Sequence, residues 1–95
     1  MAKLSTAARD AALNKLDGWA YEANGKSIVK QFGFADFRTA FAFMTHVAFL
    51  AEKAGHHPDW SNSYNRVTIS LTTHDDGGVS KKDIALAQAI EAIAG

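Results

Sequence analysis

The alternation of apolar and polar residues in Arg66–Thr73 constrains the fold of this chain more than any other feature. The apolar members of the alternation are Val67, Ile69 and Leu71. A period of two is typical of a β-strand with one buried face and one polar face. Asp59–Ser63 precedes this strand across Tyr64-Asn65, so the two segments are predicted to pair as a hairpin.

A second hairpin is predicted nearer the amino terminus. Trp19–Glu22 and Ser27–Phe34 read as strands on either side of Asn24-Gly25, two residues that tolerate the positive φ angles of tight turns. Lys30 interrupts the apolar face of the second strand. We therefore expect that strand to be an edge strand or to be only partly buried.

A long helix is expected between the two hairpins. Asp36 is placed to cap it and Gly55 to end it, so that it reaches about Ala54. Its apolar residues form two neighbouring stripes, which are Phe37, Phe41, Met44, Ala48 and Ala51, and Ala40, Phe43, Val47, Leu50 and Ala54. Together the stripes predict a face wide enough to cover a sheet.

Shorter helices are predicted near both ends of the chain. Ser5 suits the N-cap of a helix over Ala7–Leu16, and Ser80 with Asp83 resembles a capping box that opens a helix reaching about Ala94. The predicted order is α-β-β-α-β-β-α. Strand pairs joined by tight turns predict an α+β fold, a four-stranded antiparallel sheet with helices packed on one face, in a single domain over residues 1–95.

Composition argues against several classes of protein. Ten basic and ten acidic residues cancel, which argues against nucleic-acid or anionic-membrane binding as the main function and permits self-association. The chain has no cysteine, so it has no disulfide and no thiolate nucleophile or metal ligand. Residues 1–5 lack the pattern of a signal peptide and no stretch approaches a membrane span, so we expect a cytoplasmic protein.

The run Glu52–Trp60 contains the candidate site. His56 and His57 stand between the end of the long helix and the next strand, and His74 ends the later strand, from where it could return to the same place. An unperturbed imidazole pKa of about 6.5 lets a histidine give and accept protons near neutral pH. A proton-transfer site is the leading hypothesis. Because adjacent side chains diverge, we do not expect His56 and His57 to act on the same atom.

Each candidate residue also has a simpler explanation. A helix-terminal histidine can merely satisfy the last carbonyls, Asp83 can merely cap its helix, and Trp60 can merely pack in its hairpin. The histidines with Glu52 or Asp83 could also ligate zinc, but adjacent histidines form an awkward chelate and no His-x-x-x-His spacing occurs among them. Acid/base chemistry without a metal or another cofactor is the preferred interpretation.

The spacing of these residues resembles the pterin-4a-carbinolamine dehydratase family (4a-hydroxytetrahydrobiopterin dehydratase). The motif is Glu52-x-x-x-His56-His57-Pro58-x-Trp60, Tyr64-Asn65, Thr72-Thr73-His74 and Asp83-Ile84. Matches in Lys30–Phe32 and Phe37–Thr45 extend the resemblance over nearly all of the chain. It implies the same α+β fold and a homodimer or homotetramer. One departure is Gly55, where some members carry an acidic residue.

The resemblance implies a lyase that dehydrates 4a-hydroxytetrahydropterin to quinonoid dihydropterin and so supports tetrahydropterin recycling. It implies that His56 and His74 act as acid and base, while Glu52 and Asp83 orient or tune them. The residues expected to bind the pterin substrate are His57, Thr72, Thr73, Trp60 and Asp83.

An interaction function is the alternative that the resemblance leaves open. Some family members stabilise dimers of a transcription factor, and others look like assembly factors without catalysis. On that interpretation the chain is a non-catalytic binding module with a protein partner. The retention of His56, His57 and His74 favours the enzyme, because an interaction module has no need for them.

Overall fold

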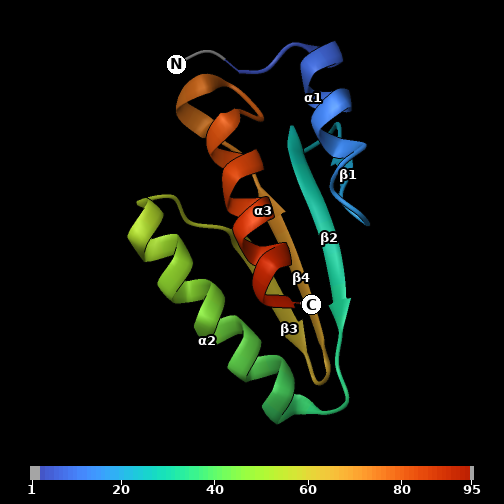
Figure 1. The fold of residues 1–95 in the computed structure, drawn as a ribbon, viewed down its shortest axis with the longest axis vertical. Coiled ribbons are helices and arrows are strands. Elements are labelled where there is room, and N and C mark those ends of the chain that lie inside the picture. Colours follow the sequence, from blue (N-terminus) through green and yellow to red (C-terminus); the bar gives the residue numbers. More distant parts are fainter. Residues whose placement is uncertain (1–2, 95) are drawn as a thin grey trace.

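The computed structural model describes residues 3–94, so predictions that involve Met1, Ala2 or Gly95 lie outside it. The elements are α1 (Thr6–Leu13), β1 (Ala20–Glu22), β2 (Ser27–Gly33), α2 (Phe37–Ala54), β3 (Asp59–Ser63), β4 (Arg66–Leu71), the 3₁₀ turn η1 (His74–Asp76) and α3 (Lys81–Ala94) (Figure 1). The predicted α+β fold and element order are confirmed. Within residues 3–94, none of the helices combines the length and apolar character that crossing a membrane requires.

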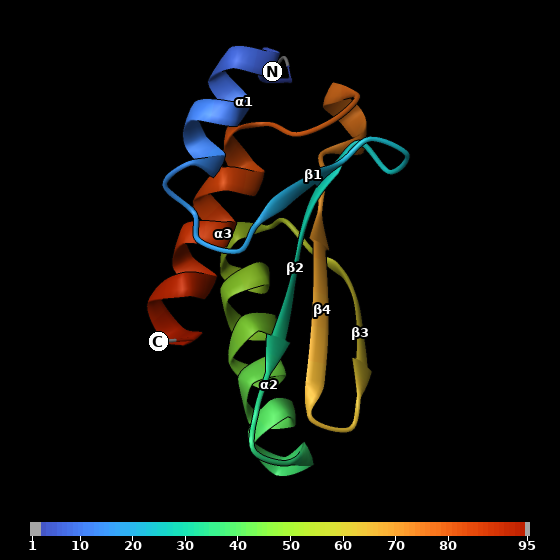
Figure 2. The same ribbon diagram turned by 90° about the vertical axis from the view of Figure 1, so that its right-hand side faces the viewer.

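The four strands form one antiparallel sheet in the order β1-β2-β4-β3. Both predicted hairpins are present, and β2 pairs with β4 so that Ile28 faces Leu71 and Phe32 faces Val67. Figure 2 shows the three helices on one side of the sheet, as predicted. Because β1 and β3 form the edges, β2 is central and the edge-strand prediction was wrong, whereas its partial burial is confirmed.

Lys30 shows how a central strand accommodates a cation. Its Nζ donates to Glu91 Oε2 of α3 and to the carbonyl oxygen of Asp17, each at 2.8 Å. Trp19 Nε1 donates to the same Glu91 oxygen at 2.9 Å. These charge-assisted hydrogen bonds replace the water that a half-buried ammonium loses, so β2 tolerates the lysine without lying at an edge.

The predicted helix caps are confirmed. Ser5 Oγ accepts a hydrogen bond from an amide in the first turn of α1, and Asp36 Oδ1 accepts from the amide of Thr39 at 2.8 Å. The hydrogen bond from Thr39 lowers the pKa of Asp36 below its ordinary value of 3.8. The helix α1 ends at Leu13 instead of the predicted Leu16, because the chain tightens there into turns of the 3₁₀ type.

The apolar face of α2 is narrower than predicted. Its buried residues are Ala40, Phe43, Val47 and Ala51. Phe37 and Phe41, from the other predicted stripe, are 47% and 54% exposed, and Phe49 is 71% exposed. The first stripe is therefore only partly covered: Met44 and Ala51 pack inward, whereas Phe37 and Phe41 remain exposed.

The two hairpin turns place left-handed backbone at residues that were not expected to adopt it. In the β1–β2 turn the positive φ falls on Lys26, at 52°, and not on Asn24-Gly25. In the β3–β4 turn it falls on Tyr64, at 49°. The Lys26 turn is tied to the end of β4, because Thr72 Oγ1 donates to the carbonyl oxygen of Lys26 at 2.7 Å.

Candidate active site

The end of α2 sends His56 and His57 toward different partners. Gly55 adopts the left-handed conformation that ends many helices, with φ of 64°, and the amide of His56 still bonds back to the carbonyl oxygen of Ala51. Pro58 then prevents the helix from continuing and leads the chain into β3. The two imidazoles diverge, as predicted, and each contacts a different carboxylate.

His56 is held by Asp83, in the first turn of α3. Its Nε2 lies 2.6 Å from Asp83 Oδ1. The His56 side chain is 12% exposed, and the Asp83 side chain is fully buried. Because a buried carboxylate needs donors for both oxygens, the second one is also satisfied: Oδ2 accepts from the Thr73 hydroxyl and from the Ser80 amide, each at 2.8 Å. Asp83 thus completes the predicted capping box of α3 and also binds His56.

This network also determines where protons lie. Thr73 donates its only hydroxyl proton to Asp83, so in the 2.7 Å contact between Thr73 Oγ1 and Ser80 Oγ the donor is Ser80. A carboxylate has no proton to give, so Nε2 of His56 donates to Asp83. Nδ1 of His56 is then the ring nitrogen that remains to exchange a proton with a bound molecule.

His57 forms the second histidine–carboxylate pair. Its Nε2 lies 2.8 Å from Glu52 Oε1, and the two side chains are 63% and 79% exposed. The sequence placed Glu52 one helical turn before His56 as a partner for that ring, whereas the structure pairs Glu52 with His57. A pair this exposed contributes little to stability, so the His57 ring can turn toward a ligand at small cost.

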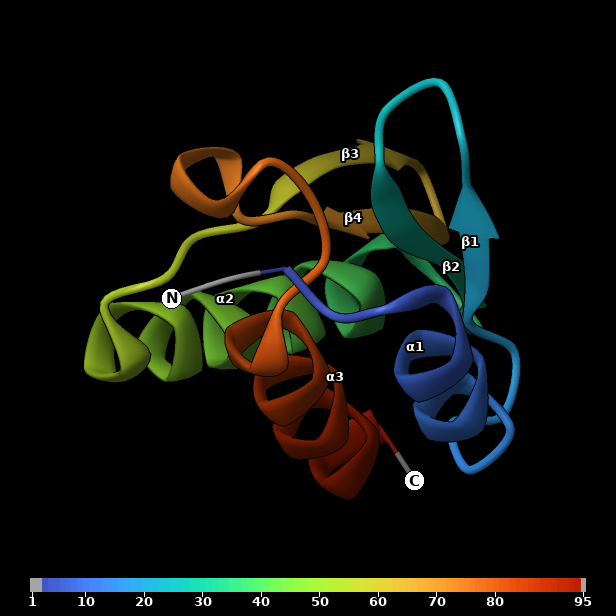
Figure 3. The same cartoon turned by 90° about the horizontal axis from the view of Figure 1, so that it is seen from above.

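A cleft of about 320 Å³, which we call the histidine cleft, opens between the end of α2 and the segment from β4 to α3. Its lining residues are Gly55, His56, His57, Thr72, Thr73, His74, Asp75 and Lys82. Figure 3 shows the η1 segment between the carboxyl end of α2 and the β1–β2 turn. The structure therefore brings His56, His57 and His74 to one cleft from two separate segments.

The end of β4 builds the wall of the cleft that carries His74. Thr73 and Gly78 form an isolated bridge, with hydrogen bonds between their backbone groups, which closes η1 into a short loop. His74 is the first residue of that loop and its side chain is exposed. The loop thus sets a solvent-exposed imidazole in the cleft that also contains the nearly buried His56.

Three predicted site residues do not line the cleft. Trp60 lies in β3 and packs against the core. Asp83 lies behind His56, and Glu52 contacts the cleft only through His57. Trp60 therefore fits the packing explanation that the sequence left open, and the two carboxylates are positioned to orient histidines.

Two lining residues were missed by the sequence analysis. Lys82 precedes Asp83 in the first turn of α3, and Asp75 directly follows His74. The signal that could have found Lys82 was its position inside the capping box, since a residue between Ser80 and Asp83 must lie near whatever Asp83 binds. Both residues add charge at the rim of the histidine cleft.

The cleft offers imidazoles in two kinds of surroundings. His56 is fixed by a buried carboxylate, whereas His57 and His74 are exposed. Within residues 3–94, no three His, Cys, Asp or Glu side chains are grouped so that they could hold a metal ion. This set of side chains can deliver a proton to one atom of a bound molecule and remove a proton from another.

Comparison with known sequences places the chain among close relatives. A family model described as pterin 4 alpha carbinolamine dehydratase matches residues 2–93. A protein of Rhizorhabdus wittichii is 57% identical over 83 residues, which make up 87% of this chain and 86% of that protein. A protein of Chloroflexus aggregans is 55% identical over 95 residues, covering 100% of both chains. Both carry the provisional name pterin-4-alpha-carbinolamine dehydratase.

Two solved structures share the fold. A transcriptional coactivator/pterin dehydratase from Brucella melitensis is 45% identical and superposes with a TM-score of 0.94, over 98% of this chain and 99% of that chain. A pterin dehydratase-like protein identified as a RuBisCO assembly factor in the alpha-carboxysome is 28% identical, with a TM-score of 0.63 over 73% of this chain and 80% of that chain.

Proposed function

Because the chain belongs to the pterin-4-alpha-carbinolamine dehydratase family, whose members are hydro-lyases, we propose that it dehydrates a 4a-hydroxytetrahydropterin by histidine acid/base catalysis. The product is a quinonoid dihydropterin, so the reaction supports tetrahydropterin recycling. The observation that carries the proposal is the His56–Asp83 pair, whose imidazole lines the same cleft as His57 and His74.

The reaction needs one proton donor and one proton acceptor. The bond between C4a and its hydroxyl oxygen breaks, the proton on N5 is removed, and the electron pair of the N5–H bond forms the C4a=N5 double bond. The hydroxyl accepts a proton and leaves as water, so the balance requires no oxidant or reductant. General acid/base catalysis of this kind contributes about 10²–10⁴-fold to the rate.

We assign the two proton transfers to His56 and His74. Asp83 fixes the ring of His56 and its Nε2 proton, which leaves Nδ1 for the substrate. His74 is exposed in the same cleft, where it can approach the opposite end of the reacting C4a–N5 unit. One fixed and one exposed imidazole together supply the acid and the base of the elimination.

We assign substrate binding to His57 and to Thr72–Thr73 at the end of β4, which border the cleft. Glu52 is a positioning residue for His57, through the 2.8 Å contact between them. The expected contact of Trp60 with the pterin is left out of the proposal, because the Trp60 ring packs against the core.

The test is the dehydration of freshly generated 4a-hydroxytetrahydropterin, followed by ultraviolet absorbance. We expect the wild-type protein to accelerate it over the spontaneous rate and to be insensitive to a chelator. His56→Ala and His74→Ala should each lose about 10²–10⁴-fold of the catalysed rate. The matched control is His46→Ala, an exposed histidine of α2 that does not line the cleft. No acceleration by the wild type, or activity that a chelator abolishes, would contradict the proposal.

A specific observation favours a second role in protein assembly. Phe37 and Phe41 are about half exposed, with ring centres 5.7 Å apart, and Phe49 of the same helix is 71% exposed. We call these three side chains the phenylalanine row of α2. Exposed apolar patches of this kind mark interaction surfaces. One structural relative is described as a transcriptional coactivator/pterin dehydratase and another as a RuBisCO assembly factor. We propose that this row mediates a homodimer or homotetramer, with another protein as the alternative partner.

Light scattering on the wild type and on Phe41→Ser/Phe49→Ser tests the assembly role. We expect an oligomer for the wild type and a smaller species for the variant. A monomeric wild type would contradict self-association through α2, and an oligomer that survives the double substitution would assign the contact to another surface.

A further inference from the structure

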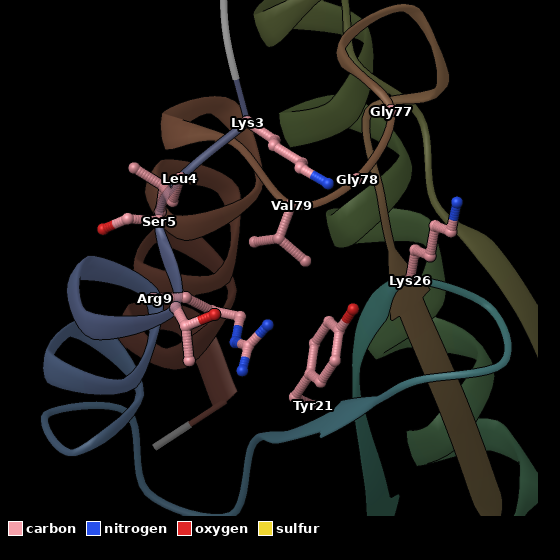
Figure 4. Close-up of a pocket in the computed structure, with 10 residues that line it drawn as sticks. Lys3, Leu4, Ser5, Arg9, Tyr21, Lys26, Gly77, Gly78 and Val79 are labelled. Atoms are coloured by element: carbon pink, nitrogen blue, oxygen red, sulfur yellow. The ribbon is translucent and has the colours of Figure 1, made fainter.

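A second cavity, also of about 320 Å³, lies between the start of α1, the β1–β2 hairpin and Gly77–Val79. Figure 4 shows Lys3, Arg9 and Lys26 around it, with Tyr21 of β1 between the last two. None of the described residues that line it is acidic. This basic cavity therefore gathers positive charge in a chain whose formal net charge is zero, and the proposed dehydration does not use it.

Two lysines from distant parts of the chain converge on Gly78. A Cβ atom placed on Gly78 would lie 3.5 Å from Lys3 Cδ and 3.9 Å from Lys26 Cβ. The φ of Gly78, 157°, disfavours a side chain there, so the space between the two lysines stays open. Both lysines line the basic cavity, so their positive charges would attract an anion bound there.

Arg9 adds a third cation that is already held in place. Its guanidinium carbon lies 3.6 Å from the centre of the Tyr21 ring, and it pairs with Asp10 at 3.2 Å. Asp10 offsets part of its charge, and Asp76 of the neighbouring η1 adds another carboxylate to this region. Three cations and two carboxylates leave this region a formal charge of +1, and Arg9 offers N–H donors that Asp10 does not use.

A smaller cavity of about 220 Å³, which we call the bridging cavity, shares lining residues with both the basic cavity and the histidine cleft. This bridging cavity shares Lys26, Gly77 and Gly78 with the basic cavity. It shares Thr72 and His74 with the histidine cleft. The three cavities thus follow one another around η1, which Figure 3 shows between the end of α2 and the β1–β2 turn.

Thr72 links the two ends of this path. It lines both the histidine cleft and the bridging cavity, and its hydroxyl donates to the carbonyl oxygen of Lys26 at 2.7 Å. The hydrogen bond holds the β1–β2 turn, with Lys26 in left-handed backbone, beside the candidate active site. The backbone of Lys26 is in this way anchored to the same residue that borders the proposed pterin site.

From this continuity we propose that the basic cavity is an anion subsite for a phosphate or carboxylate on the side chain of the pterin substrate. The proposal rests on the proposed function and deepens it. The pterin ring occupies the histidine cleft, its side chain follows the bridging cavity past Thr72 and His74, and the anionic group lies among Lys3, Arg9 and Lys26. The protein then distinguishes pterins by the charge at the far end of their side chains.

The experiment compares kcat/KM for 4a-hydroxytetrahydropterins that differ only in the end of one side chain: a neutral 2,3-dihydroxypropyl group, the phosphate ester of its terminal hydroxyl, and a terminal carboxylate of equal length. We expect the wild type to prefer an anionic form. The preference, expressed as the ratio of anionic to neutral kcat/KM, should fall about tenfold in Lys3→Gln/Lys26→Gln and should weaken at high salt. Comparing the phosphate with the carboxylate identifies which anion is bound.

The matched control is Lys15→Gln/Lys81→Gln, which, like the double variant, removes two positive charges, here from exposed lysines outside the three cavities. The control should leave the ratio unchanged. If it lowers the ratio as much as the double variant does, the preference reflects overall charge and the anion subsite is refuted. Equal kcat/KM for all three substrates, unchanged in the double variant, would also refute it while leaving the dehydratase proposal intact.

If no substrate is dehydrated faster than in buffer, the proposed function fails and the substrate-linked form of this inference fails with it. A titration with inorganic phosphate then tests the anion subsite by itself, through the amide resonances of Tyr21 and Gly78. Shifts in the wild type that disappear in Lys3→Gln/Lys26→Gln would support the subsite. Their absence through the millimolar range would overturn it.

Discussion

Two histidine–carboxylate pairs begin at adjacent residues and lie in opposite surroundings. His56 and Asp83 are 2.6 Å apart, with 12% and 0% of their side chains exposed. His57 and Glu52 are 2.8 Å apart, with 63% and 79% exposed. The partners and distances are nearly the same. What differs is that buried protein donors complete the first pair, whereas the second stands in solvent.

Burial, and not the presence of a carboxylate partner, therefore determines how firmly each imidazole ring is held. Removing one partner of a buried pair leaves the other without solvation, so the arrangement is rigid. In an exposed pair, water replaces either partner, so the arrangement is loose. A rigid ring suits proton transfer at a defined atom, and a loose ring suits contact with a substrate that enters and leaves.

Removing each imidazole in turn should reveal the largest difference between the two pairs. His56→Ala should lower kcat by about 10²–10⁴-fold, because the oriented proton donor or acceptor is lost. His57→Ala should lower kcat/KM by about tenfold, mainly through KM, because a binding contact is lost. Steady-state dehydration kinetics measure both. Equal effects on kcat would show that burial does not separate the two roles.

Removing each carboxylate tests the difference in stability. Asp83→Ala should lower the free energy of unfolding by about 3 kcal/mol, because His56, Thr73 and the Ser80 amide lose a buried partner. Glu52→Ala should change it by less than about 0.5 kcal/mol. Urea denaturation provides the comparison. If Asp83→Ala does not fold, Asp83→Asn keeps the shape and should lose about 10–100-fold in kcat; full activity of that variant would contradict the orienting role.

Ionic strength should affect the exposed His57–Glu52 pair and not the buried His56–Asp83 pair. Glu52→Gln should raise KM about two- to threefold at low ionic strength, and the difference from wild type should shrink at about 0.5 M salt, because exposed charges are screened. The kcat of the wild type should be insensitive to the same salt, since the His56–Asp83 pair is shielded from solvent. A KM difference that persists at high salt would mean that Glu52 acts by shape and not by charge.

Asp36 extends the comparison to a carboxylate held by a backbone amide. The Thr39 hydrogen bond keeps its pKa below 3.8, so its stabilising effect is present at neutral pH and is lost as the pH falls through that lowered value. Thermal melts of wild type and Asp36→Ala should therefore differ slightly near neutral pH, and the difference should shrink as the pH falls below 3.8. Asp36→Asn, which can still cap but cannot titrate, is the control. A gap that stays constant with pH would contradict the assignment.

The fold was predictable because its signals are local. Capping residues, tight turns and alternation at Val67, Ile69 and Leu71 each act within a few residues, and the structure confirms the elements they predict. Two local signals misled. The Asn24-Gly25 pair marked the right turn, but the positive φ falls on Lys26. Phe37 and Phe41 belong to an apolar stripe of α2 but remain exposed, because burial depends on which side of the helix packs.

The site was only half predictable, because its partners are distant in sequence. His56, His57 and His74 could be placed in one cleft from the element order. Which carboxylate holds which imidazole could not, since Asp83 is 27 residues from His56 and reaches it only through the packing of α3 against α2. Sequence proximity favoured Glu52 for His56, and the turn at the end of α2 overrode it.

The left-handed Gly55 has a consequence for how this cleft can evolve. A Cβ there would meet nothing within 4 Å, so the fold restricts the position only through its φ of 64°. That restriction amounts to about 1–2 kcal/mol for most residues and is lowest for asparagine and aspartate. Substitutions at position 55 can therefore change the charge at the rim of the histidine cleft without disturbing the packing. Position 83 does not tolerate substitution in this way, because its carboxylate both caps α3 and orients His56.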